Sequence, residues 1–158
     1  MCFPATRRRT EMDETASSPV QLTGGCLCGA VRFSATPRKP EMDACHCSMC
    51  RKWTGGMFMA VPCGSSVSVA DESSLKAFAS SEWGERVFCS DCGTSLFWRL
   101  RDGGETMVSM HAFDDITSFH FAEEIFIDEK PALYDFRNDT RKLTGAEVMA
   151  AFAAGQGS

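Results

Sequence analysis

The chain has 158 residues, of which 44% are hydrophobic and 23% are charged, as is typical of one soluble globular domain. Its net charge of -5 argues against the extended basic surface that drives non-specific binding to nucleic acid. No apolar run reaches the roughly 20 residues of a membrane-spanning helix, and residues 1–20 lack the apolar stretch of a secretory signal. We therefore expect a cytoplasmic protein without a nucleic-acid or membrane partner.

Residues 1–20 are rich in Thr, Ser, Glu and Arg, which predicts a disordered tail. From residue 21, short apolar alternations separated by glycine indicate strands and turns. Strands are predicted within residues 31–35, 41–45, 57–61, 67–69, 86–88, 96–100, 107–110 and 119–127. The continuous apolar run at 57–61 is typical of a strand in the centre of a sheet, whereas residues 73–81 could form either a helical turn or a loop.

The end of the chain predicts a short helix. Thr144 and Glu147 have the spacing of a capping box, in which each side chain binds a backbone amide of the first helical turn. Apolar residues follow it at helical spacing, from Val148 to Phe152. The predicted organisation is a tail (1–20), a mainly β domain (21–136) and a C-terminal extension with a short helix (137–158).

Nine cysteines are present, and seven of them are grouped in C-x-C and C-x-x-C spacings. Such spacings, in a chain without a secretion signal, favour metal binding over a disulfide framework. The two isolated cysteines have other interpretations. Cys2 is interpreted as an incidental thiol of the tail, and Cys63, which follows a proline, as a small buried hydrophobic residue rather than a ligand.

Two thiol pairs, Cys26 with Cys28 and Cys89 with Cys92, are each followed by a glycine, which permits the backbone to curl after the second thiol. Tetrahedral zinc has zinc-sulfur bonds of about 2.3 Å, so its sulfur ligands lie roughly 3.8 Å apart. The two pairs together can complete one structural four-cysteine site, which contributes folding free energy rather than chemistry. Alternatively, Cys89 and Cys92 could form a metal-free redox dithiol.

Cys45, Cys47 and Cys50 place three further thiols within six residues. Three ligands are one short of a closed zinc shell, and catalytic zinc sites commonly have three protein ligands and one exchangeable position. The fourth ligand could be water, a substrate thiol, Cys63 or a histidine. His46 is disfavoured because its side chain points away from its two neighbours in an extended segment. This assignment of four thiols to one metal site and three to the other keeps each cluster local, although the seven thiols could also be distributed differently between two sites.

The charged and imidazole groups near these thiols have alternative interpretations. Arg51 and Lys52 could offset the net charge of about -1 that three thiolates leave on a zinc ion, or they could be solvated surface residues. His111 and His120 are interpreted as residues of the strand region without a ligand role.

Three segments in this order, GGCLCGAVRF (24–33), CHCSMCRKWTG (45–55) and FCSDCGTSLF (88–97), resemble the glutathione-dependent formaldehyde-activating enzyme family, whose domain is shared with centromere protein V. The resemblance covers residues 21–136. It implies a mainly β, tent-like zinc-binding fold of short antiparallel strands with two zinc ions per chain. It also implies which thiols hold which ion: Cys26, Cys28, Cys89 and Cys92 the structural zinc, and Cys45, Cys47 and Cys50 the catalytic zinc.

The implied activity is that of a carbon-sulfur lyase of the S-(hydroxymethyl)glutathione synthase type, which joins a thiol such as glutathione to formaldehyde or a similar small aldehyde. Two departures from the family pattern lie outside the metal sites. Glu123 and Glu124 stand where members often have a histidine, and Leu133 and Tyr134 stand near a position often held by tryptophan. The alternative function is a non-catalytic, zinc-stabilised binding module, which a fourth protein ligand on the three-cysteine site would favour.

Overall fold

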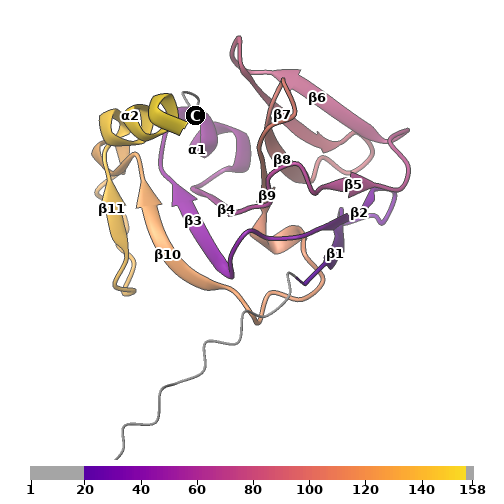
Figure 1. The fold of residues 1–158 in the computed structure, drawn as a ribbon, viewed down its shortest axis with the longest axis horizontal. Coiled ribbons are helices and arrows are strands. Elements are labelled where there is room, and N and C mark those ends of the chain that lie inside the picture. The colour runs from indigo at the N-terminus through magenta and orange to yellow at the C-terminus, as the bar shows by residue number, and fades with distance from the viewer. Residues whose placement is uncertain (1–19, 156–158) are drawn as a thin grey trace, which may run out of the picture.

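Two β-sheets organise residues 20–155, the part of the chain that the computed structural model describes (Figure 1). The small sheet has the order β1-β2-β5, and the large sheet has the order β11-β10-β3-β4-β9-β8-β7-β6. The strands of the small sheet are β1 (Leu22–Gly25), β2 (Arg32–Ala35) and β5 (Ser68–Val69). Cys2 and the predicted tail, apart from its last residue, lie outside the described residues.

The strands of the large sheet are β3 (Glu41–Cys45), β4 (Phe58–Pro62), β6 (Leu75–Ala79), β7 (Gly84–Cys89), β8 (Ser95–Leu100), β9 (Thr106–Ser109), β10 (His120–Ile125) and β11 (Arg141–Leu143). The helices are α1 (Ser48–Thr54) and α2 (Gly145–Gly155), with two 3-10 turns, η1 (Met110–Ala112) and η2 (Ile127–Glu129). Among residues 20–155, no helix combines the length and the apolar character needed to cross a bilayer.

The mainly β fold and the central position of β4 confirm the predictions from the sequence. The strands are not all antiparallel, because β10 pairs in parallel with both β3 and β11.

The segment 73–81 forms neither a helical turn nor an isolated loop: it contains β6, which pairs antiparallel with β7. Four of the five β6 residues are exposed. Because the strand buries no face, its sequence lacks the regular alternation of apolar and polar residues by which strands are predicted. The domain boundary predicted at residue 136 stays a prediction, although β11 of the extension joins the large sheet.

The main core lies between the two sheets. Alternation along β2 buries Phe33 and Ala35 on one face, as predicted. The ring of Phe33 packs edge-on against Phe97, with centroids 5.1 Å apart, and against Phe113 at 5.5 Å. Cys63 belongs to this core with 2% of its surface exposed, which confirms its interpretation as a buried hydrophobic residue.

The predicted C-terminal helix is confirmed together with its capping box. The Thr144 amide donates to Glu147 Oε2 over 2.7 Å, and the Glu147 amide donates to Thr144 Oγ1 over 3.3 Å. The Gly145 amide donates to Asp128 Oδ1 over 2.8 Å, which ties the start of α2 to η2. In Figure 1, α2 lies beside α1, the short helix of the three-thiol segment.

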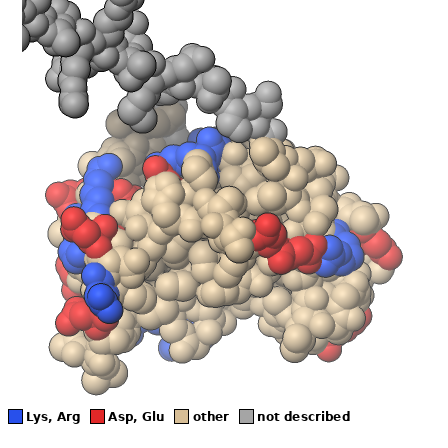
Figure 2. Space-filling model, turned by 90° about the horizontal axis from the view of Figure 1, so that it is seen from below, with Lys and Arg blue, Asp and Glu red and all other residues tan. Residues whose placement is uncertain are grey.

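The surface carries charges of both signs. On the face shown in Figure 2, Lys and Arg side chains lie next to Asp and Glu side chains at the margins, and most of the area between them is uncharged. Salt bridges such as those of Arg38 with Glu105 and Arg141 with Glu123 neutralise basic groups locally.

The small sheet packs closely on η1 at Gly24, where a side chain has no room. A Cβ atom there would lie 2.3 Å from the Ala112 carbonyl oxygen and 2.4 Å from the Phe33 ring. We expect Gly24→Ala to lower the free energy of unfolding by about 1–3 kcal/mol through overpacking. Gly56→Ala is the matched control, because its Cβ would meet nothing within 4 Å. Denaturant unfolding measures both, and equal stabilities of the two variants would contradict this account.

Candidate metal centres and active site

The first thiol cluster joins the two sheets. The sulfur atoms of Cys26, Cys28, Cys89 and Cys92 lie within 4.8 Å of one another, with 3.5 Å between Cys26 and Cys28 and 3.8 Å between Cys28 and Cys89. A disulfide would need about 2.05 Å, whereas these separations match the spacing of sulfur ligands around zinc. The donor set therefore fits a four-coordinate metal that links the turn after β1 to the turn after β7.

Backbone geometry and hydrogen bonds prepare this cluster for a cation. Gly29 and Gly93 have positive φ angles of 83° and 75°, so each thiol pair is followed by the left-handed residue that its glycine predicts. The Val31 amide donates to the Cys26 sulfur over 3.2 Å. The Thr94 hydroxyl lies 3.1 Å from the Cys92 sulfur, and hydrogen bonding from Thr94 lowers the pKa of Cys92 to about 5.

The second thiol cluster lies where β3 passes into α1. Cys45 ends the strand, Cys47 caps the helix, and Cys50 lies in its first turn; the Cys50 amide donates to the Cys47 sulfur over 3.4 Å. The three sulfur atoms lie within 4.8 Å of one another. The sequence analysis did not predict α1, because seven residues are too few to show an apolar helical period.

The three thiols perturb one another because they share a small buried space. Hydrogen bonds with Cys47 and Cys50 raise the pKa of Cys45, and burial adds to this effect. Hydrogen bonds from Cys45 and Cys50 lower the pKa of Cys47. One thiolate is thus favoured at the expense of its neighbours, and full ionisation of all three requires a cation between them.

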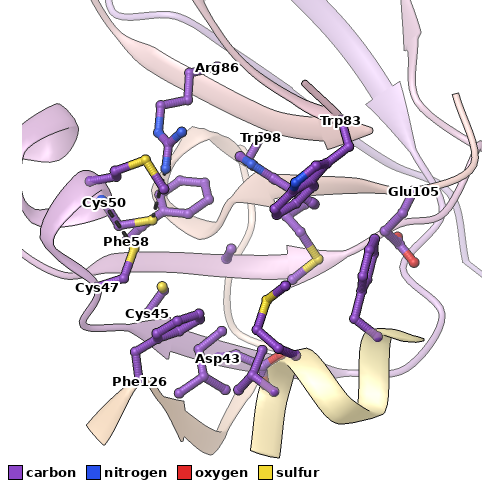
Figure 3. A pocket seen from close by; sticks show the side chains of 17 residues that line it. Asp43, Cys45, Cys47, Cys50, Phe58, Trp83, Arg86, Trp98, Glu105 and Phe126 are labelled. Carbon is purple, nitrogen blue, oxygen red and sulfur yellow. Dashed lines mark hydrogen bonds between the residues drawn. The ribbon is translucent and has the colours of Figure 1, made fainter. Parts of the chain in front are cut away.

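The protein's own cation at this cluster is Arg86, which the sequence analysis missed. Arg86 is buried on β7, and its Nη2 donates to the Cys50 sulfur over 3.6 Å (Figure 3). Its guanidinium lies 5.6 Å from the Trp53 ring centroid, and its Nε is the one buried side-chain nitrogen or oxygen without a partner in the described part of the chain. Neither basic residue considered from the sequence takes this place: Arg51 donates to the His46 carbonyl and Lys52 is exposed.

His46 is fully buried, and its ring binds groups other than the thiols. Its Nδ1 lies 2.9 Å from the Tyr134 hydroxyl and its Nε2 lies 3.0 Å from Glu124 Oε2. Burial lowers the pKa of His46 and so favours the neutral ring at neutral pH. These partners fit the tautomer in which Nε2 donates to Glu124 and Nδ1 accepts from Tyr134.

Glu124 is the charged centre of this His46 network, with 1% of its side chain exposed. Burial would raise its pKa, but hydrogen bonds from Thr140 and His46 and the charge of Lys142 outweigh burial and lower it. Thr140 donates to Glu124 Oε1 over 2.6 Å, and Lys142 Nζ lies 3.4 Å from the same oxygen. Glu124 and Tyr134 are two of the departures from the family pattern noted above, and here both bind the ring of His46.

The other candidate fourth ligands lie apart from the three thiols. His111 and His120 are exposed, His120 beside Glu41 at 3.7 Å. Cys63 is in the main core, and burial raises its pKa to about 12. Among residues 20–155, no further Cys, His, Asp or Glu completes the cluster of Cys45, Cys47 and Cys50.

A cavity of about 260 Å³ opens on the three-thiol cluster (Figure 3). Its walls come from β3, β4, β7, β8, β9, β10, both α-helices and the loop before β7. Its lining includes the aromatic and apolar side chains of Met49, Phe58, Trp83, Trp98, Met107, Ile125, Phe126, Val148, Met149 and Phe152. The charged residues of the lining are Asp43, Arg86 and Glu105, and burial raises the pKa of Asp43 to about 6.

The fold and these thiol clusters define a class, a mainly β protein with one four-cysteine and one three-cysteine cluster. Comparison with known proteins identifies the family. Residues 21–129 match the family described as "Glutathione-dependent formaldehyde-activating enzyme". The chain belongs to this family.

Individual relatives agree with this assignment. An uncharacterized lyase of Schizosaccharomyces pombe is 37% identical over 130 residues, which are 82% of this chain and 95% of that protein. A protein of Halomonas elongata whose provisional name is that of the family is 34% identical over 85 residues, covering 48% of this chain and 54% of its own. A crystal structure of a Rhodobacter sphaeroides protein shares the fold, with a TM-score of 0.52, 23% identity, and coverage of 59% of this chain and 88% of that chain.

The His46 network predicts a stability difference between two adjacent carboxylates of β10. Glu124→Gln removes the buried charge that accepts from His46, Thr140 and Lys142, and we expect it to lower the free energy of unfolding by about 1–3 kcal/mol. Glu123→Gln is the control, because Glu123 forms only a partly exposed pair with Arg141 and should cost less than about 1 kcal/mol. Denaturant unfolding of both variants makes the measurement; a larger loss from Glu123→Gln would argue against the network.

Proposed function

We propose that this chain is a cytoplasmic, zinc-dependent enzyme of the carbon-sulfur lyase type. It joins a thiol, with glutathione as the family's example, to a small aldehyde such as formaldehyde at Cys45, Cys47 and Cys50. The observation that carries the proposal is the open cluster itself: three converging buried thiols, no fourth ligand among the described residues, and a cavity that begins at the sulfur atoms.

Two zinc ions per chain are part of the proposal. Cys26, Cys28, Cys89 and Cys92 hold the structural ion, and Cys45, Cys47 and Cys50 hold the catalytic ion. The spacing of the sulfurs and the all-thiol donor set support zinc at both places. The catalytic ion supplies positive charge that favours the thiolate form of a substrate thiol near neutral pH.

The chain's own residues prepare the site for addition of a thiol to a carbonyl. Arg86 offsets the negative charge of the thiolate ligands, and the aromatic walls exclude water, which strengthens this electrostatic interaction. In the net reaction a carbon-sulfur bond forms and the π bond of the carbonyl breaks. The thiol proton ends on the former carbonyl oxygen, so the addition needs neither an oxidant nor a reductant.

The reaction is tested by mixing the zinc-loaded protein with glutathione and ¹³C-labelled formaldehyde and following the adduct by NMR. Acceleration over the uncatalysed rate that disappears in Cys47→Ser supports the proposal. No acceleration with glutathione or with an apolar thiol such as phenylmethanethiol, by a protein that carries both zinc ions, would contradict it and would favour a zinc-stabilised binding module.

The division between structural and catalytic zinc predicts different outcomes for two cysteine variants. Wild-type protein should carry two zinc ions, and Cys47→Ser should carry one while keeping its fold, because the four-thiol site remains complete. Cys89→Ser should lose the other ion and lose stability, because that site joins the two sheets. Native mass spectrometry counts the metals and circular dichroism reports the fold. Loss of both ions and of the fold in Cys47→Ser would overturn the division.

The buried guanidinium predicts an effect on metal affinity. Arg86→Met removes the positive charge beside Cys50, and we expect zinc at the three-thiol site to bind about 10–100-fold more weakly, as is typical when a supporting partner of a ligand is lost. Lys52→Met is the control, because Lys52 is exposed and should leave the affinity unchanged. Competition with a chromophoric chelator measures both. Equal affinities of the two variants would assign Arg86 a packing role only.

A further inference from the structure

One wall of the cavity comes from outside the part of the chain that matches the family. The match ends at residue 129, whereas α2 spans Gly145–Gly155 and contributes Val148, Met149 and Phe152 to the lining. Two contacts hold the helix in place: its first amide binds Asp128, and the Phe152 ring lies 5.4 Å from the Trp83 ring. The C-terminal extension therefore shapes the space in front of the three thiols.

The rest of the lining is also mostly apolar and aromatic. Trp83 and Trp98 pack edge to face with centroids 5.8 Å apart, and Phe58 lies beside the thiols (Figure 3). A small polar substrate would leave most of this surface without a partner. A ring or an alkyl chain would cover it and would remove its own apolar surface from water.

The charged residues of the lining offer little to an anionic substrate. Arg86 is the one basic residue among those that line the cavity; its Nη1 and Nη2 already bind Ser80 and Cys50, and only its buried Nε has no partner. Glu105 accepts from the Gly64 amide and pairs with Arg38, and the third charged residue, Asp43, is another acid. The two carboxylates of glutathione would thus be desolvated beside acidic groups, with one buried nitrogen of Arg86 as the only unpartnered donor of a basic side chain in the lining, and this arrangement costs free energy.

The size of the cavity agrees with a compact apolar group. An apolar cavity of about 150 Å³ in another protein binds benzene. The 260 Å³ available here therefore accommodates an aromatic ring together with the short linker that would carry a sulfur atom to the thiol cluster.

We propose that the thiol substrate of this chain carries an aromatic or alkyl substituent instead of the charged peptide of glutathione, and that α2 selects it. This inference rests on the proposed function, because it places the substrate sulfur at Cys45, Cys47 and Cys50. The substituent fills the cavity that Phe58, Trp98 and the α2 side chains line, and a small aldehyde completes the addition described above.

The test compares phenylmethanethiol with glutathione on the full-length, zinc-loaded protein, with toluene as a probe that lacks sulfur. Trp83 and Trp98 line the cavity, so their fluorescence reports binding without reference to turnover. We expect phenylmethanethiol to bind at least about tenfold more tightly than glutathione, and Phe152→Ala to weaken both phenylmethanethiol and toluene by about tenfold. Phe78→Ala is the matched control, because Phe78 is 63% exposed on β6 and does not line the cavity. Tighter binding of glutathione, or equal effects of the two variants, would overturn the inference.

Met149→Lys provides a second variant that does not depend on removing a packed ring. Met149 is 44% exposed at the cavity, so a lysine there can reach solvent while presenting a cation to a substrate carboxylate. We expect this variant to shift the ratio of affinities toward glutathione by about fivefold or more. An unchanged ratio in a folded variant would count against selection by α2.

The NMR adduct assay separates failure of this inference from failure of the proposed function. Faster adduct formation from glutathione than from phenylmethanethiol, unaffected by Phe152→Ala, would overturn the substrate class and leave the lyase-type function standing. Adduct formation from neither thiol, with phenylmethanethiol and toluene still bound, would overturn the proposed function and with it the substrate role of the cavity. Faster addition of phenylmethanethiol, reduced by Phe152→Ala, supports both.

Discussion

Three thiols that converge in a buried space cannot all ionise unless positive charge lies between or beside them. Arg86 supplies part of this positive charge: its guanidinium is buried, and its Nη2 lies 3.6 Å from the Cys50 sulfur. A single guanidinium balances one thiolate, so the remaining charge calls for a metal ion within the cluster. The apolar surroundings strengthen each of these interactions, and they also make the cluster unfavourable without its cation.

The two thiol clusters occupy different places in the fold, which suit them to different roles. The four-thiol cluster lies between turns of the two sheets, so a metal ion bound there would cross-link them. The three-thiol cluster lies where strand β3 of the large sheet passes into helix α1, and it faces a cavity. Behind it, His46 anchors the segment to Glu124 and Tyr134, and Thr140 and Lys142 extend this network into the C-terminal extension. The extension thus supports the site from behind through β11 and bounds it in front through α2.

Much of the site could be predicted from the sequence because its thiols are grouped locally. Spacings of two and three residues predicted the clusters at Cys26, Cys89 and Cys45, and the capping box predicted α2. The parts of the site that could not be predicted depend on contacts between residues far apart in the sequence. Nothing in the sequence around Arg86 distinguishes it from other residues of a strand. It lies 36 residues from Cys50 in the chain, and only tertiary packing brings its guanidinium into contact with the Cys50 sulfur. The exposed strand β6 and the short helix α1 lacked the periodicity on which such predictions depend.

The central claim is that the cluster of Cys45, Cys47 and Cys50 holds zinc with one position left for a substrate thiol. X-ray absorption at the zinc edge, recorded on the two-zinc protein before and after addition of a thiol, tests it most directly. Before addition, we predict seven sulfur ligands shared between the two ions together with one light-atom ligand. Addition of phenylmethanethiol should replace the light atom with an eighth sulfur. A spectrum that already shows two closed shells of protein ligands, and that does not change with thiol, would contradict the claim.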